Sequence, residues 1–156
     1  MSSAEPFRRG TPQGPGQVLF EFVRHWSRRS NPSPNDSATA EQGRLVLVTE
    51  AVHSVARREP ATVNAVADEL GMDQSGASRL VKSAVAAGFL RMRASESDGR
   101  RRHVTVTPAG LTMLDQAHAW QETVFDRLAE GWSDRQRDDF QQAMLALLSR
   151  SHTIDP

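Results

Sequence analysis

The chain has 156 residues and no cysteine, which excludes disulfides, thiolate metal sites and cysteine-based redox sensing. Apolar residues make up 38% and charged residues 24% of the sequence, as in ordinary globular proteins, and no apolar run approaches the roughly 18 residues that a membrane span needs. The formal net charge is zero, which by itself argues against a nucleic-acid partner.

The N-terminal part of the chain predicts a tail followed by two helices. Residues 1–16 are rich in proline, glycine and serine and predict a flexible tail; no apolar run follows a basic cluster there, so we expect a cytoplasmic protein without a secretory signal. Residues 17–29 carry apolar side chains at helical spacing, and two prolines at 31–35 end that helix. Thr39 is then placed to cap a second helix that runs to about Arg58.

Two shorter helices follow within about 25 residues. Thr62 is placed to cap a helix that ends at Leu70, and Asp73 is placed to cap a helix over residues 74–87. Gly71 supplies the tight turn between them. The spacing of helix, turn and helix predicts a helix-turn-helix.

After Gly88 the apolar pattern changes from helical spacing to alternation. Residues 89–93 and 103–107 alternate around a polar turn, which predicts a two-stranded hairpin, and a hairpin after a helix-turn-helix is a winged helix. Pro108 fits the first turn of a long helix, and Ser133 or Asp134 can cap a last helix that ends near Arg150.

The charges are distributed unevenly along these elements. From Met72 to Thr107 seven cations stand against three acidic residues, a net charge of about +4, whereas residues 108–150 carry four cations against seven acidic residues, a net charge of about −3. This asymmetry predicts a basic functional surface on residues 72–107, while residues 108–150 form an acidic remainder of the molecule.

The second helix of the helix-turn-helix carries candidates for reading DNA. Such a helix enters the major groove, where Gln pairs with adenine and Arg with guanine, while hydroxyls and Lys hold phosphate. The candidates in this helix are Gln74, Ser75, Ser78, Arg79 and Lys82. The alternative is a polar helix face that only contacts solvent.

The hairpin and the helix-turn-helix resemble the multiple-antibiotic-resistance regulator (MarR) family. Residues 98–110 (DGRRRHVTVTPAG) resemble the wing pattern of the family, and residues 66–75 with 87–90 resemble its helix-turn-helix and first wing strand, within a likeness from about Gln17 to Arg150. The chain departs from the family pattern at Ala84, where a larger aliphatic residue is common, at Gly76 and in the two-proline loop. The departures at Ala84 and Gly76 predict a looser recognition helix, which is the second helix of the helix-turn-helix.

The hairpin tip is the second predicted DNA contact. Arg100 is placed to enter a narrow minor groove, where negative potential is concentrated, and Arg101 and Arg102 would add phosphate contacts. The resemblance implies that Asp98 orients a nearby Arg by ion pairing. The alternative for these residues is a solvated basic turn.

We expect a homodimer, because one winged helix makes few contacts and a twofold dimer reads two half-sites. Apolar stripes on the first and last helices exceed what a small domain can bury, although they could instead close an intrachain core. The predicted interface residues are Leu19, Phe22, Val23, Trp26, Phe140, Met144, Leu147 and Leu148. The resemblance implies that the terminal helices of two protomers intertwine.

The resemblance also implies a ligand pocket between the dimer helices and the DNA-binding part. Side chains there could stack on an aromatic acid or phenol and hydrogen-bond to it, although each is also a common core or interface residue. The candidates are His25, Trp26, His53, His118, Trp120 and Gln121.

Together these patterns predict a mainly α (α+β) fold, a winged helix-turn-helix DNA-binding domain flanked by N- and C-terminal dimerisation helices. The predicted parts are a tail at 1–16, a dimerisation helix and loop at 17–38, the winged helix-turn-helix at 39–107, the C-terminal dimerisation helices at 108–150 and a tail at 151–156.

The predicted function is a sequence-specific double-stranded-DNA-binding transcriptional regulator, which we expect to repress as a homodimer on a pseudo-palindromic operator and to be released by a small aromatic or phenolic ligand. It would lie on the bacterial nucleoid when bound, with no cofactor, metal or membrane partner. No Gly-rich phosphate loop, HExxH motif or nucleophile elbow is present, so an enzyme is not expected. Two alternatives are a winged helix that binds protein, which the basic helix and wing contradict, and a metal-responsive regulator using His118 with Asp115 or Asp126.

Overall fold

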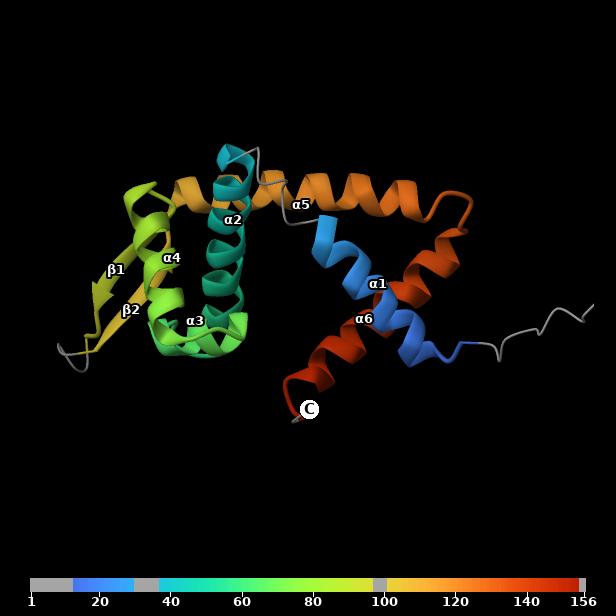
Figure 1. Cartoon of the computed structure of the whole chain (residues 1–156), viewed down its shortest axis with the longest axis horizontal. Coiled ribbons are helices and arrows are strands. Elements are labelled where there is room, and N and C mark those ends of the chain that lie inside the picture. The colour runs from blue at the N-terminus through green and yellow to red at the C-terminus, as the bar shows by residue number, and fades with distance from the viewer. Residues whose placement is uncertain (1–12, 30–36, 97–100, 155–156) are drawn as a thin grey trace, which may run out of the picture.

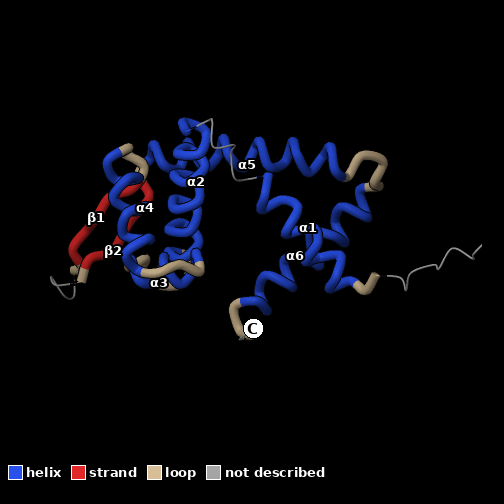
Figure 2. Tube along the Cα trace, viewed as in Figure 1, coloured by secondary structure: helices blue, strands red, loops and turns tan. Residues whose placement is uncertain are grey.

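The computed structural model describes residues 13–29, 37–96 and 101–154. Within these ranges the chain forms six α-helices and one two-stranded antiparallel sheet (Figure 2). The predicted mainly helical fold with a two-stranded wing is confirmed. The predicted N-terminal tail up to residue 12, the two-proline loop, and the hairpin tip with Asp98 and Arg100 lie outside the described residues.

Two parts of the molecule lie at opposite ends of one long helix (Figure 1). Helix α5 (Pro108–Leu128) has 21 residues and is about 32 Å long. At one end lie α2 (Ser37–Ala56), α3 (Val63–Leu70), α4 (Gln74–Ala86), β1 (Leu90–Ala94) and β2 (Arg102–Val106), which with the first turns of α5 are called the winged lobe. At the other end lie the terminal helices α1 (Pro15–Arg29) and α6 (Asp134–Ser151).

The helix starts in the winged lobe follow from capping side chains. The side chain of Thr62 accepts a hydrogen bond from the backbone N–H of Ala65, and Gly71 ends α3 in the left-handed conformation at φ 62°. The predicted caps at Thr62 and Ser133 are confirmed, and Ser133 forms a full capping box with Gln136. The prediction for Thr39 is wrong, because α2 already begins at Ser37 and places Thr39 inside its first turn.

The hairpin joins the helices through both its face and its edge. β1 and β2 pair with Leu90 opposite Val106 and Met92 opposite Val104, and Leu90 and Val104 are buried. On the far edge of β2, the backbone N–H of Val104 donates to the carbonyl oxygen of Ala61 at 2.8 Å. The segment before α3 therefore extends the sheet and fixes the wing against the end of α2.

The main apolar cluster lies in the winged lobe; outside this lobe, Ala129 at the turn after α5 is also buried. The cluster is built from the inward faces of α2, α3 and α4, the hairpin and the first turns of α5, and its members are Leu45, Val48, Ala51, Val52, Val55, Ala61, Val66, Val81, Ala84, Leu90, Val104, Met113 and Leu114. Ala84 is fully buried, so its small side chain lets α4 approach the core closely.

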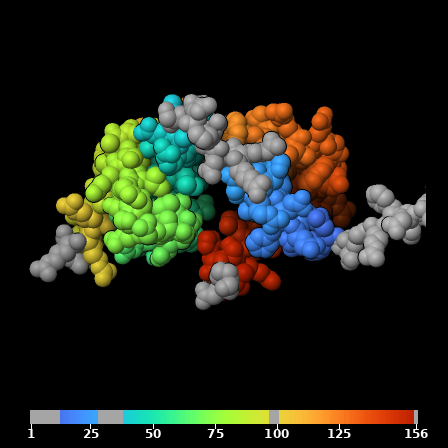
Figure 3. All heavy atoms as spheres, viewed as in Figure 1, coloured from blue at the N-terminus to red at the C-terminus, as the bar shows by residue number. Residues whose placement is uncertain are grey.

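The terminal helices do not contribute to this core. Helix α6 has no buried residue among those described, and the apolar side chains of α1 are exposed or half-buried. In the space-filling view α1 and α6 form a separate group of atoms beside the winged lobe (Figure 3). The apolar stripes therefore do not close an intrachain core within the described residues.

Candidate nucleic-acid interface

The start of α4 is held by a tight cap at Asp73. The two carboxylate oxygens of Asp73 accept hydrogen bonds from the Ser75 hydroxyl at 2.7 Å and from the backbone N–H of Gly76 at 3.0 Å. These two bonds hold the pKa of the Asp73 carboxyl below its ordinary value, so it is ionised at neutral pH. A negative cap at the positive end of α4 also favours the helix.

The cap explains why position 76 is a glycine. A Cβ atom at this position would lie 2.6 Å from the Asp73 carboxylate oxygen that caps the helix. The glycine therefore permits a close cap, and the prediction of a looser recognition helix is not supported at this end of α4, which is regular from Gln74 to Ala86.

The candidate side chains of α4 lie on its solvent side. Gln74, Arg79 and Lys82 are exposed and Ser78 is half-buried, while Ala77, Val81 and Ala84 on the opposite side are buried. Neither the Arg79 guanidinium nor the Lys82 ammonium forms an ion pair with another described residue. Ser75 contacts Asp73, so its hydroxyl takes part in the cap.

The wing brings a second set of cations next to this helix. Arg101 and Arg102 are exposed at the start of β2, and the carbonyl oxygen of Arg101 accepts from the Ser95 N–H at 2.7 Å, which closes the hairpin. The hairpin protrudes from the end of the winged lobe beside α4 (Figure 1). The roles predicted for Asp98 and Arg100 fall outside the described residues.

The six predicted pocket residues lie on three different helices. His25 and Trp26 contact each other on α1, and Trp120 is exposed on α5. His118 on α5 forms a hydrogen bond with Glu50 on α2 at 2.7 Å, and His53 is half-buried on α2. Gln121 follows Trp120 on α5 and lines a groove between α5 and α6. The structure therefore does not gather the six side chains around one cavity.

The predicted interface residues form exposed apolar faces on the terminal helices. Of the eight, only Trp26 is half-buried, and the others are exposed. On the α6 side the groove beside α5 has a volume of about 810 Å³ and is lined by Phe125, Phe140, Met144, Leu145 and Leu148 among others.

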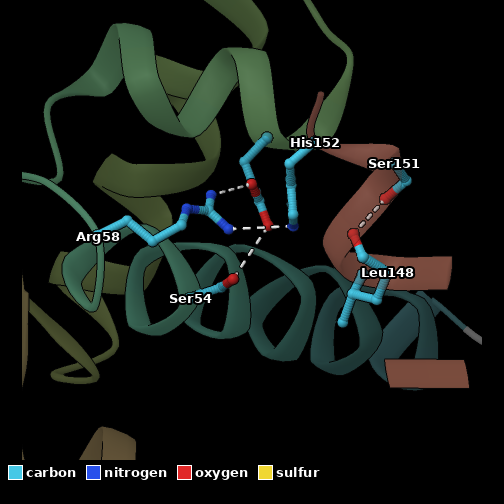
Figure 4. Close-up of polar contacts among 6 residues, drawn as sticks. Ser54, Arg58, Leu148, Ser151 and His152 are labelled. Atoms are coloured by element: carbon cyan, nitrogen blue, oxygen red, sulfur yellow. Dashed lines mark hydrogen bonds and ion pairs between the residues drawn. The ribbon is translucent and has the colours of Figure 1, made fainter. Parts of the chain in front are cut away.

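A polar cluster that the sequence did not predict joins α2, α3 and the end of α6 (Figure 4). Arg58 forms an ion pair with Glu69 at 2.6 Å, Ser54 donates to the same carboxylate at 3.1 Å, and an Arg58 guanidinium nitrogen lies 3.3 Å from Nε2 of His152. Its members are far apart in sequence, so no local pattern could have found it.

Metal and membrane features are not found in the described residues. No group of three or more His, Asp or Glu side chains there is arranged to hold a metal ion, and the hydrogen bond of His118 runs to Glu50 and not to the acidic residues of the metal hypothesis. None of the helices in the described ranges has the length and apolarity to cross a bilayer.

The comparisons with known proteins agree with this architecture. The model of the MarR family matches residues 48–101, which run from α2 into the wing, and the predicted resemblance to that family is confirmed. No protein of curated function matches the sequence.

Three solved structures with the same fold illustrate the match. E. coli MarR in its apo form has a TM-score of 0.64 at 16% identity, covering 89% of this chain and 99% of that one. A MarR-family transcriptional regulator from Silicibacter pomeroyi has a TM-score of 0.60 at 18% identity, covering 88% and 92%. The S. aureus MepR–DNA complex has a TM-score of 0.53 at 12% identity, covering 87% and 95%.

Proposed function

We propose that this protein is a sequence-specific double-stranded-DNA-binding transcriptional regulator that acts as a homodimer. The observation that carries the proposal is the solvent side of α4, where Gln74, Arg79 and Lys82 are exposed beside a basic wing and the two cations form no ion pair with another described residue. Gln and Arg can form bidentate hydrogen bonds with adenine and guanine in the major groove, and Lys and hydroxyls can hold phosphate. The wing arginines, with Arg100 at the tip, would then enter the adjacent minor groove or contact its phosphates.

The fold comparisons support this assignment. The family model covers the helix-turn-helix and the first wing strand, and a DNA complex is among the structures that share the fold. The alternative of a protein-binding winged helix is less favoured, because Arg79 and Lys82 on α4 are exposed and neither forms an ion pair with another residue in the described ranges.

The homodimer is supported by the uncovered terminal helices. Their apolar side chains are exposed in a single chain, as expected if a second copy covers them. Dimerisation would present two copies of α4 to a pseudo-palindromic operator, so that each copy reads one half-site. Residues 17–38 and 108–150 would then form the dimerisation part, apart from the first turns of α5, which pack in the winged lobe, and residues 39–107 the DNA-binding part.

Repression, and release by a small aromatic or phenolic ligand, stay predictions. The His118–Glu50 hydrogen bond joins α2 to α5, so a ligand that bound near His118 could change the position of the winged lobe on the long helix. Such a change in spacing would alter the fit to two half-sites.

The test begins with in vitro selection of DNA fragments by the purified protein, followed by titration of the selected duplex. We expect Arg79→Ala to lose roughly 10- to 100-fold in affinity for the selected site, because a bidentate Arg–guanine contact gives about 1–3 kcal/mol of discrimination. The variant should keep most of its weaker binding to unrelated duplexes. Arg135→Gln is the matched control, because Arg135 is exposed in the first turn of α6, and α6 begins next to the end of α5 that is distant from the winged lobe (Figure 1).

The proposal fails if the wild-type protein shows no salt-sensitive affinity for any duplex. If Arg79→Ala and Gln74→Ala both bind the selected site as the wild type does, α4 does not read the bases.

A further inference from the structure

The register of the hairpin separates its residues into two faces. Leu90 and Met92 of β1 face the core, because Leu90 is buried and Met92 packs against the core cluster. Side chains alternate along a strand, so Arg91 and Arg93 project from the opposite face, and both are exposed. Their cross-strand partners are Thr105 and His103, which share that outward face.

The end of α2 brings another cation to the same face. A groove of about 490 Å³ runs between residues 56–61 and the edge of β2, and its lining includes Arg57, His103 and Thr105. Val104 also lines the groove, so the groove follows the edge of β2, and Arg57 lies beside that edge near His103 and Thr105. The four side chains Arg57, Arg91, Arg93 and His103 are here called the outer wing surface.

The outer wing surface has few counter-ions of its own. None of the side chains of Arg57, Arg91 and Arg93 forms an ion pair with another residue in the described ranges. The neighbouring Arg58 differs, because Glu69 neutralises it. Glu59 lines the groove and Glu96 follows β1, so three arginines and a histidine face two carboxylates. A positive potential remains that an external anion can satisfy.

We infer that the outer wing surface binds backbone phosphates of the DNA that flanks each half-site, in addition to the contacts made by α4 and the hairpin tip. This inference rests on the proposed function. Its basis is continuity, because Arg91 and Arg93 lie on one face of the hairpin and lead toward Arg101, which precedes β2; Arg102, opposite Ala94, lies on the other face. Arg93 lies one residue from the end of β1, and Arg91 lies about 7 Å further from the tip.

The position of the hairpin explains why the contacted DNA lies outside the half-site. The wing protrudes at the extreme end of the molecule, on the side away from the terminal helices (Figure 3). A duplex that passes the hairpin tip continues beyond it, and its phosphates are then the nearest dense array of negative charge. The contacts are to phosphate, so they add affinity and salt dependence without adding sequence preference.

The test compares two duplexes with the same selected site. The short duplex ends at the outer edges of the two half-sites, and the long duplex adds about one helical turn, roughly 10 base pairs, on each side. We expect the wild type to prefer the long duplex. Arg91→Gln/Arg93→Gln should weaken binding to the long duplex about tenfold, with binding to the short duplex unchanged within about twofold.

Salt dependence gives a second readout. Each phosphate contact contributes a slope of about 0.9 to the plot of log affinity against log salt concentration, so the double variant should lose roughly two or more units of slope on the long duplex. Arg135→Gln, a cation exposed on α6, is the matched control and should change neither quantity. Because Arg91 and Arg93 are exposed, the thermal melting of the double variant should match that of the wild type.

The inference is overturned if the double variant binds the long duplex with wild-type affinity and slope, in which case the surface faces an acidic protein or solvent only. It is also overturned if binding to both duplexes falls equally, since the arginines would then act within the half-site. These outcomes are distinct from failure of the proposed function, in which the wild type itself binds neither duplex.

Discussion

At the scale of single residues, Thr107 and Gly110 fasten the start of α5 to the turn between α4 and the wing. The Thr107 hydroxyl donates to the carbonyl oxygen of Gly88 at 2.6 Å and accepts from the N–H of Gly110 at 3.1 Å. A Cβ atom on Gly110 would lie 2.3 Å from the carbonyl oxygen of Phe89. The backbone itself occupies that space, so no side-chain rotation could relieve the contact.

We therefore expect Gly110→Ala to lower the free energy of unfolding by roughly 2 to 3 kcal/mol, as overpacking against a fixed backbone does. Gly43→Ala is the matched control, because Gly43 lies within α2 and a Cβ atom there meets nothing within 4 Å. That control should raise stability by about 0.5 to 1 kcal/mol. Urea unfolding of the three proteins measures both effects, and equal stability of Gly110→Ala and the wild type would contradict the close approach.

Residue-level prediction from the sequence succeeded where the physics is local. The caps at Thr62 and Asp73 follow from a polar residue just before an apolar helical pattern, and both are confirmed. Thr39 failed because Ser37 and Thr39 both suit a helix start, and the sequence does not decide between neighbouring candidates. The close approach at Gly110 depends on backbone distant in sequence, which no local pattern contains.

At the scale of elements, the Arg58–Glu69 ion pair joins the end of α2 to α3. Burial by itself raises the pKa of Glu69, but hydrogen bonds from Arg58 and Ser54 and the charge of Arg58 outweigh it and hold the pKa below its ordinary value of 4.5. A carboxyl whose pKa is lowered by folding stabilises the protein above its unfolded pKa, and that contribution is lost as the pH falls through the folded pKa.

Glu69→Gln should accordingly lower the free energy of unfolding at pH 7 by up to about 1 kcal/mol, the upper range for a partly exposed ion pair. The difference from the wild type should shrink as the pH falls below 4.5, where Glu69 itself becomes protonated. A series of urea unfolding experiments at pH values from about 3 to about 7 measures this difference. Glu130→Gln, an exposed carboxylate, is the control. A difference that stays constant across this range would mean that the charge of Glu69 does not stabilise the fold.

Element type and order could be read from the sequence because each element carries its own periodicity. Alternation over residues 103–107 identified β2, and helical spacing identified α5 and α6. The same alternation places Arg91 and Arg93 opposite the core face, so it contained the signal for the outer wing surface, although the sequence-based site stopped at the tip. The Arg58 cluster in Figure 4 lacked any such signal, since it depends on how three helices meet.

At the scale of the whole molecule, the core and the exposed apolar surface occupy different ends of α5. The winged lobe holds the buried core cluster and leaves few large apolar side chains exposed, such as Leu47 and Leu111, whereas α1 and α6 leave Phe20, Phe22, Leu145 and Leu148 exposed among others. The sequence predicted these stripes but not their place, because periodicity shows which face of a helix is apolar and not what covers it. Within the described residues nothing covers these faces, as expected if a second copy covers them.

A charged substitution on the exposed apolar face of α6 should weaken dimer assembly without unfolding the winged lobe. Leu148 is 56% exposed in the single chain, so Leu148→Asp should cost the isolated protomer little. In a dimer the same carboxylate would be buried without a partner, at a cost of about 3 kcal/mol or more, which corresponds to a dissociation constant raised at least roughly a hundredfold. Sedimentation of the wild type and variant over a range of concentrations measures this shift, and DNA affinity should fall with it because two half-sites would no longer be read together.

The control for this experiment is Leu111→Asp, which introduces the same charge at an exposed apolar position in the first turn of α5. A carboxylate is favourable at the N-terminal end of a helix, and this position belongs to the winged lobe and not to the terminal helices. We expect Leu111→Asp to sediment as the wild type does. If Leu148→Asp also assembles normally while the wild type is dimeric, the dimer must use another face, and the exposed stripe of α6 would need a different partner. If both variants dissociate, the loss of assembly does not identify an interface on α6, because Leu111 lies in α5 and outside the terminal helices.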